Sequence, residues 1–127
     1  MKIFISQPMK GYSNQQIENI RKQIIVKAKE LFGSDIEIIN SFFKNEPTNA
    51  KPLWYLGKAL QKMSEADVVI FAVLSDGVTC SMARGCRIER KCAYEYGYIS
   101  WFVPINSTTN KVGNITEKIE LPMLWSD

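Results

Sequence analysis

The segment from residue 83 to residue 97 places one acid, Glu89, on a helix face that is otherwise apolar or small. Cys86, Glu89, Ala93 and Tyr96 are spaced by three, four and three residues, which puts them on one stripe of a helix. A carboxylate on such a stripe is a candidate catalytic group. The chain contains no histidine, so catalysis would have to use carboxylates, amides, hydroxyls, lysine or arginine.

The position of Glu89 also has a purely structural explanation. Glu89 could form an ion pair with Arg84 or Lys58 at the margin of the core, because structural ion pairs also occupy such positions. The spacing on the helix leaves both interpretations open.

The elements that would position Glu89 alternate between strands and helices. Apolar runs predict strands over residues 3–5, 36–39, 68–73 and 98–103. Apolar residues at intervals of three and four predict helices over residues 13–33, 52–64 and 83–96, with a weak terminal helix over residues 115–119. Residues 42–52 are expected to form a long loop.

This alternation predicts one α/β domain over residues 1–127, because crossover helices join parallel strands. We expect a three-layer sandwich with a parallel, flavodoxin-like or Rossmann-like sheet of about four or five strands in the order 2-1-3-4. The carboxyl ends of the first three strands would then bring Ser6 to Gly11, Asn40 with Ser41, and Asp76 to one edge. Ligands bind at that edge in open α/β sheets.

Composition excludes several classes of function. The chain has 127 residues, 46% hydrophobic content and a net charge of +3, with its basic residues scattered along the whole length. No basic run favours nucleic acid, and no apolar run predicts a membrane span or a signal peptide, so we expect a cytoplasmic protein. Cys80, Cys86 and Cys92 have neither disulfide-framework nor zinc-site spacing.

Neither the dinucleotide-binding nor the P-loop glycine pattern is present, so no cofactor and no metal is predicted. Gly11 and Gly85 each have two explanations. Either glycine serves a turn or a helix end, or it lets the backbone approach a ligand closely.

Several motifs together resemble the nucleoside 2-deoxyribosyltransferase-like superfamily, especially its small, largely uncharacterised members from bacteria and phages. The resemblance covers roughly residues 1–103. It is carried by Ile3-Phe4-Ile5-Ser6-Gln7-Pro8-Met9-Lys10-Gly11, Asn40-Ser41-Phe42-Phe43, Leu53-Trp54-Tyr55-Leu56-Gly57-Lys58, Ala66-Asp67-Val68-Val69, and Arg84-Gly85-Cys86-Arg87-Ile88-Glu89 with Ala93 and Gly97.

In the established enzymes of that superfamily, a helix-borne glutamate attacks the anomeric carbon of the deoxyribose. Glu89, Ala93 and Gly97 match the spacing of that motif, so the resemblance implies that Glu89 is the nucleophile. A glutamate with an ordinary pKa would be ionised for this role at neutral pH. The transferases also carry an Asp-x-Gly-Thr-like turn before the glutamate. Here the nearest upstream acid is Asp76, thirteen residues away.

The resemblance therefore implies an enzyme that cleaves or exchanges an N-glycosidic bond of a nucleoside or nucleotide, acting as a homo-oligomer. A non-catalytic protein that sequesters a nucleotide-derived ligand is the alternative, and a module that keeps only the fold is a third possibility. The Ser75 to Ser81 segment could cover the site as a lid or reshape it for another ligand. The predicted catalytic residues are Glu89 and Asp76, and the predicted substrate-binding residues are Ser6, Gln7, Pro8, Met9, Gly11, Asn40, Ser41, Ser81, Arg84 and Gly85.

Overall fold

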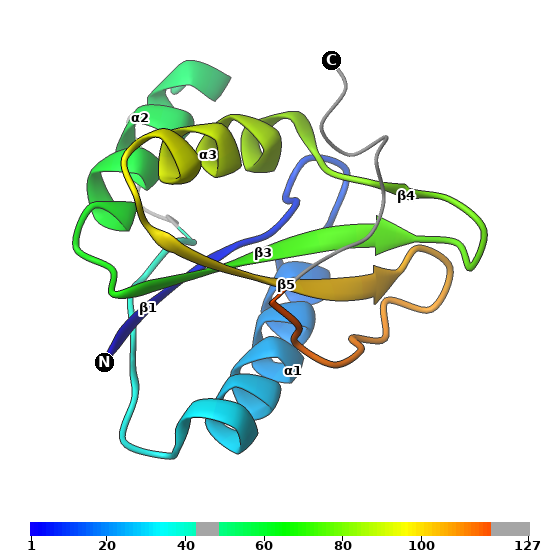
Figure 1. The fold of residues 1–127 in the computed structure, drawn as a ribbon. Helices are drawn as coiled ribbons and strands as arrows, with labels where there is room; N and C mark the ends of the chain where they lie inside the picture. Colours follow the sequence, from blue (N-terminus) through cyan, green and yellow to red (C-terminus); the bar gives the residue numbers. More distant parts are fainter. Residues whose placement is uncertain (43–48, 118–127) are drawn as a thin grey trace.

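The computed structural model describes residues 1–42 and 49–117. In it, these residues form a mostly parallel β-sheet with helices on both faces (Figure 1). The strands are β1 (Lys2–Ser6), β2 (Glu37–Ile38), β3 (Val68–Ser75), β4 (Cys80–Ser81) and β5 (Ile99–Asn106), and the helices are α1 (Asn14–Phe32), α2 (Pro52–Met63) and α3 (Arg84–Glu95). The predicted α/β fold with three layers is confirmed.

The parallel part of the sheet has the order β2-β1-β3-β5, which is the predicted order once β5 is taken as the expected fourth strand. β1 pairs with β3 from Ile3 opposite Val68 to Ser6 opposite Phe71. Because β1 ends at Ser6 while β3 continues to Ser75, β3 projects beyond the end of β1.

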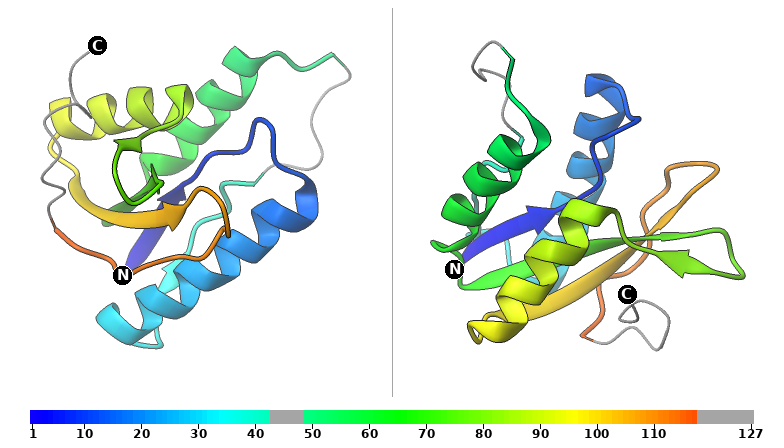
Figure 2. Two further views of the ribbon diagram at one scale, coloured as in Figure 1. Left: turned by 90° about the vertical axis from the view of Figure 1, so that its right-hand side faces the viewer. Right: turned by 90° about the horizontal axis from the view of Figure 1, so that it is seen from above.

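Helix α1 covers one face of the sheet, as Figure 2 shows from two sides. Its predicted apolar stripe is buried, and Ile20 and Ile24 pack against Ile3 and Ile5 of β1. The helix begins at a capping box, in which the Ser13 hydroxyl accepts a hydrogen bond from the Gln16 backbone N–H and the Gln16 side chain accepts one from Ser13 N–H.

Helices α2 and α3 cover the opposite face (Figure 1). There Phe4, Phe71 and Phe102 of the sheet pack with Cys86 and Ala93 of α3. Side chains alternate between the two faces along each strand, so Ser6 lies on the same face as Phe4. The register of β1 therefore directs the Ser6 hydroxyl toward α3.

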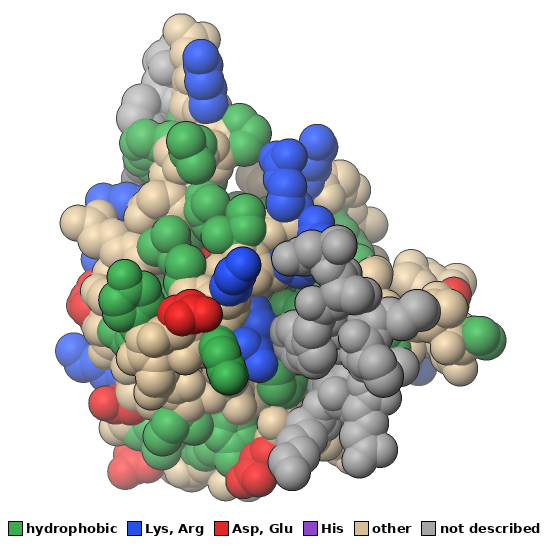
Figure 3. Space-filling model, turned by 45° about the horizontal axis from the view of Figure 1, so that its top comes forward, with side chains coloured by type: hydrophobic (Ala, Val, Ile, Leu, Met, Phe, Trp, Pro, Cys, Tyr) green, Lys and Arg blue, Asp and Glu red, His purple; other side chains and the backbone are tan. Residues whose placement is uncertain are grey.

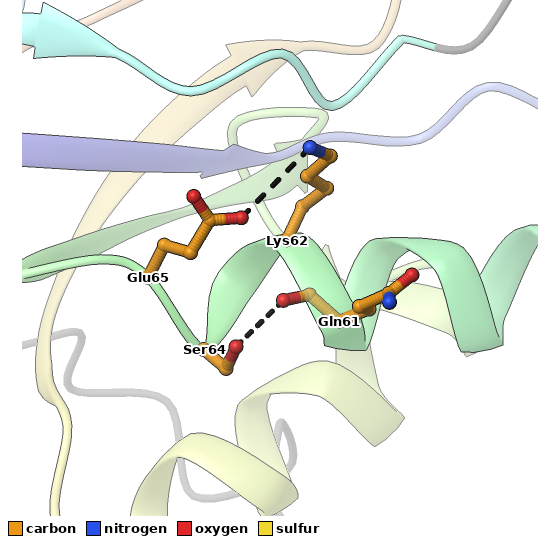
Figure 4. A network of polar contacts seen from close by, with 4 residues as sticks. All are labelled: Gln61, Lys62, Ser64 and Glu65. Carbon is orange, nitrogen blue, oxygen red and sulfur yellow. Dashed lines mark hydrogen bonds and ion pairs between the residues drawn. The ribbon is translucent and has the colours of Figure 1, made fainter.

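A few polar side chains form hydrogen bonds and an ion pair at the C-terminal end of helix α2 (Figure 4). The Ser64 hydroxyl donates a hydrogen bond to the Gln61 carbonyl at 2.6 Å, and the Ser64 N–H bonds to the Leu60 carbonyl. Lys62 and Glu65 form an exposed ion pair at 3.8 Å, which contributes little to stability. These contacts close the helix before β3 begins.

The sheet differs from the prediction through β4, which is antiparallel to β3. β4 pairs with Leu74 and Ser75, which lie on β3 beyond the end of β1. The Ser75 to Ser81 segment is thus a β-hairpin that extends outward from the sheet (Figures 1 and 2). It also returns the chain to the face where α3 starts.

The fourth predicted strand ends later than expected: the prediction stopped at residue 103, whereas β5 continues through Pro104 to Asn106. A strand residue directs its N–H and C=O to the same side. The Pro104 carbonyl accepts a hydrogen bond from Gly113 N–H at 2.8 Å, so the Pro104 nitrogen also points away from β3. The proline therefore removes no hydrogen bond from the β3–β5 ladder.

Two other expectations concern segments that the structure describes only in part. The predicted terminal helix over residues 115–119 is wrong for Ile115 to Glu117, since Thr116 instead bridges to Phe102, and residues 118–119 lie outside the described part. Most of the loop expected over residues 42–52 also lies outside it. Among the described residues, no helix is both long and apolar enough to cross a membrane.

Candidate functional site

A buried contact between Ser6 and Glu89 forms the centre of the candidate site. The Ser6 hydroxyl donates a hydrogen bond to Oε1 of Glu89 at 3.1 Å, across 83 positions of the sequence. Both side chains are buried, with exposed fractions of 1% for Ser6 and 7% for Glu89. The contact joins the carboxyl end of β1 to α3, at the edge of the sheet where the sequence predicted a site.

The apolar stripe that carries Glu89 is largely as predicted. Cys86, Glu89 and Ala93 are the buried residues of α3. Tyr96 was expected on the same stripe and is 81% exposed, because the helix ends at Glu95 and Tyr96 is its C-cap. The stripe therefore ends at Ala93.

Burial controls the ionisation of Glu89. It raises the pKa of this carboxyl from its ordinary value to about 7, because water is excluded from the charged form. The hydrogen bond from Ser6 acts in the opposite direction and lowers the pKa. Among the described residues, neither Arg84 nor Lys58 forms an ion pair with Glu89, so the ion-pair alternative has no support.

Cys86 lies on the same stripe, one turn before Glu89. Burial and the Glu89 charge raise the pKa of its thiol to about 12, while hydrogen bonding with Ser6 lowers it. The thiol is therefore protonated at neutral pH and is a poor nucleophile. Glu89 is the group of this stripe whose charge can change near neutral pH.

Ser41 lies at the neighbouring strand end and is also buried. Its hydroxyl donates to the carbonyl of Ile5 at 2.8 Å, which links the segment after β2 to the end of β1. Arg21 of α1 donates to Ser41 Oγ at 2.7 Å and to the carbonyl of Ile39 at 2.9 Å. Sequence reasoning missed Arg21, although a charged residue next to the buried Ile20 could have indicated it.

The loop between β1 and α1 contains four predicted substrate-binding residues. Gln7 is buried and donates through Nε2 to the carbonyl of Ile17 at 3.2 Å. Its Oε1 is buried and has no hydrogen-bond partner among the described residues. Pro8 is buried and Met9 half-buried.

Gly11 completes this loop as a turn glycine. Tyr12 N–H bonds to the Met9 carbonyl at 3.1 Å, and Gly11 adopts a φ of 87° at the third position of that turn. A type II turn requires a positive φ at this position, which favours glycine. The turn explanation of Gly11 is therefore confirmed.

The structure does not bring Asp76 into contact with Glu89. Asp76 lies in the β3–β4 turn and is exposed. Its Oδ1 accepts hydrogen bonds from Thr79 N–H at 2.6 Å and Val78 N–H at 2.8 Å, and its Oδ2 accepts one from the Thr79 hydroxyl at 3.0 Å. These bonds lower the pKa of Asp76, so its carboxyl is a poor proton donor at neutral pH.

The remaining predicted residues are exposed. Ser81 belongs to β4, while Arg84 and Gly85 lie in the first turn of α3, whose N-cap residue Ala83 forms no side-chain hydrogen bond. The Asn40 side chain accepts a hydrogen bond from the Phe42 backbone N–H at 3.2 Å. Among the described residues, no hydrogen bond links any side chain of this group to Ser6 or Glu89.

This arrangement gives the site one chemical capability near neutral pH. Burial raises the pKa of Glu89 to about 7, so this carboxyl can supply a carboxylate nucleophile or hold a proton. Within the described ranges, no cluster of three or more histidine, cysteine or acidic residues could hold a metal ion.

Comparison with known proteins identifies no relative of this chain. No protein-family model matches the chain, and a search of curated proteins finds no match either.

Proposed function

We propose that the protein cleaves or exchanges the N-glycosidic bond of a nucleoside or nucleotide, with Glu89 as the nucleophile. The observation that carries the proposal is the buried Ser6–Glu89 contact at the carboxyl end of the sheet. The resemblance of the Glu89, Ala93 and Gly97 spacing to the deoxyribosyltransferase motif supports the same role.

The reaction has two steps. In the first, an oxygen of the ionised Glu89 attacks the anomeric carbon, and the electron pair of the C–N bond leaves with the base. The base takes up a proton, which water can supply. In the second step, water or an acceptor base attacks the glycosyl ester and regenerates the carboxylate.

Binding without turnover is a second candidate function, because Glu89 has no acidic partner in the part of the chain that the structure describes. The pKa of Glu89 reflects burial and the Ser6 hydrogen bond, and no second carboxylate of the described residues acts on it. Asp76 uses its carboxylate in its own turn. A site that lacks a proton donor for the leaving base would suit sequestration of a nucleotide-derived ligand.

The unsatisfied Oε1 of Gln7 is compatible with either function. Buried acceptors without partners are rare in folded proteins. A hydroxyl or N–H group of a ligand that reached the β1–α1 loop would satisfy it. The hydroxyl groups of a nucleoside are donors of this kind, so the unpaired acceptor is compatible with the ligand of both proposals.

One experiment separates the two functions. The purified protein is incubated with deoxynucleosides, ribonucleosides, their 5′-monophosphates, and cyclic and ADP-ribose-type nucleotides, and the mixtures are chromatographed before and after denaturation. Release of free base supports catalysis. Intact ligand that appears only after denaturation supports sequestration, and an unchanged mixture with no bound ligand contradicts both.

We also propose that the protein is a homo-oligomer that acts in the cytoplasm. Met63 is the buried residue of α2, and Leu53 on the same helix is 75% exposed. Figure 3 shows hydrophobic side chains gathered over α2 and α3, a surface that a second copy would cover. The three cysteines are unpaired, as expected in a reducing compartment. Light scattering after size-exclusion chromatography tests the oligomer, and a monomeric mass would contradict it.

A further inference from the structure

The strand register places the Ser6 hydroxyl directly against the carboxyl group of Glu89. Ser6 is the last residue of β1, where it pairs opposite Phe71, and its side chain lies on the face covered by α3. Its hydroxyl donates to Oε1 of Glu89 at 3.1 Å. A serine hydroxyl has one proton to donate, and in the structure that proton is directed at Glu89.

The two oxygens of Glu89 differ in their contacts. Oε1 accepts the Ser6 bond, whereas Oε2 accepts no hydrogen bond from the described residues. A bond that holds one oxygen fixes the plane of the carboxylate and leaves the other oxygen free to react. A donor to a carboxylate also favours its ionised form.

We propose that Ser6 is the positioning residue of Glu89: its hydroxyl holds Oε1, favours the ionised form of the buried carboxylate, and leaves Oε2 to attack the anomeric carbon. The part of this proposal that concerns attack on the anomeric carbon rests on the proposed function. The part that concerns the ionisation of Glu89 depends only on the Ser6–Glu89 hydrogen bond. In the attack, the new bond joins Oε2 to carbon, and the C–N electron pair leaves with the base, which is protonated by water.

Within residues 1–42 and 49–117, no other group next to Glu89 could take over this role. Cys86, the titratable neighbour on α3, keeps its proton because burial raises the pKa of its thiol to about 12. No charged group on β1, β3 or α2 contributes to the pKa of Glu89 among the described residues. Of the residues that the structure describes, Ser6 is therefore the one polar partner that opposes the effect of burial on Glu89.

The test compares three serine variants. In Ser6→Ala the donor is lost, Ser6→Thr keeps a hydroxyl at the same position, and Ser41→Ala is the matched control. Ser41 is also a buried serine at a strand end, but its hydroxyl donates to the Ile5 carbonyl. Glutamate labelled with ¹³C at the carboxyl carbon reports the titration of Glu89 by NMR, and the Glu89→Gln spectrum assigns its signal.

We expect the titration midpoint of Glu89 to move to higher pH in Ser6→Ala, to return toward the wild-type value in Ser6→Thr, and to stay unchanged in Ser41→Ala. Turnover of Ser6→Ala at pH 6 should fall roughly tenfold, because a smaller fraction of the carboxylate is ionised. At pH 9, where the carboxylate is ionised in both proteins, the loss should be smaller.

An unchanged midpoint in Ser6→Ala would overturn the proposal. So would a loss of turnover that is equal at pH 6 and pH 9, since that would show a structural effect without control of ionisation. The NMR measurement needs no activity. If the wild-type protein turns over no nucleoside while the midpoint still moves, the proposed function fails and the role of Ser6 in holding the ionised carboxylate stands.

Discussion

Two carboxylates at the same end of the sheet have opposite environments. Glu89 is buried on α3 with one hydroxyl donor, and burial raises its pKa to about 7. Asp76 is exposed in the β3–β4 turn, where hydrogen bonds from Thr79 and Val78 lower its pKa. Both acids were predicted as catalytic residues, yet near neutral pH only the environment of Glu89 lets its charge change.

The difference shows that the number of donors and the access of water decide what an acid can do. Asp76 accepts three bonds within its own turn, which stabilise its charge and occupy both of its oxygens. Glu89 accepts one bond and has lost most of its hydration. The first arrangement stabilises a turn, and the second leaves a buried carboxyl whose charge can change near neutral pH.

The largest expected effect comes from Glu89→Gln. This variant keeps the size and a hydrogen-bond acceptor for Ser6, but it cannot form a glycosyl ester. We expect turnover of the nucleoside identified in the panel to fall about a thousandfold or more. The measurement is the initial rate of base release, with circular dichroism as the control for folding. Wild-type turnover in the variant would contradict the nucleophilic role.

The pH dependence of turnover tests whether Glu89 acts in its ionised form. If Glu89 acts as a nucleophile, kcat/KM should rise about tenfold per pH unit below pH 7 and level off above it, because the pKa of Glu89 is about 7. Initial rates over that range in buffers of constant ionic strength provide the test. A rate that falls as pH rises through 7 would instead indicate that the protonated carboxyl acts as an acid.

Burial of Glu89 should also make the stability of the protein depend on pH. Its pKa is raised from 4.5 to about 7 on folding, so the protonated carboxyl makes its full contribution to the free energy of unfolding below pH 4.5. Its contribution is lost as pH rises through 7, because the unfolded chain releases the proton first. The loss is on the order of 3 kcal/mol.

Urea unfolding of wild type and Glu89→Gln at pH 5 and pH 8 measures this effect. We expect the wild-type protein to lose more stability than the variant between the two pH values. Equal losses in both proteins would show that Glu89 is hydrated in solution, which would contradict its burial.

The smallest effect is expected for Asp76→Asn, which is the counterpart of Glu89→Gln in the comparison. Asparagine keeps an acceptor for the turn but loses the charge that the Thr79 and Val78 N–H groups stabilise. Turnover should stay within a few-fold of the wild-type value, while thermal denaturation should show slightly lower stability above the acid range. A loss of activity comparable to that of Glu89→Gln would restore Asp76 as a catalytic residue.

Much of the fold could be predicted because it depends on local patterns. The stripe of Ile17, Ile20 and Ile24 predicts α1, and the unbroken apolar run over residues 68–73 predicts a strand covered on both faces. The hairpin with β4 could not be predicted, because two residues on each strand leave no periodic signal. Its pairing depends on the free edge of β3 beyond β1.

The candidate site was predictable as a set of strand ends and one helix stripe, but not as contacts. The position of Glu89 on a buried helix face follows from residue spacing within one element, so it could be predicted. The choice of Ser6 rather than Asp76 as the partner of Glu89 depends instead on how distant segments pack together. The Ser6–Glu89 contact spans 83 positions and depends on the register of β1 against β3 and on the point where α3 starts after β4. The raised pKa of Glu89 also belongs to the tertiary structure, because water is excluded only after the helix has packed on the sheet.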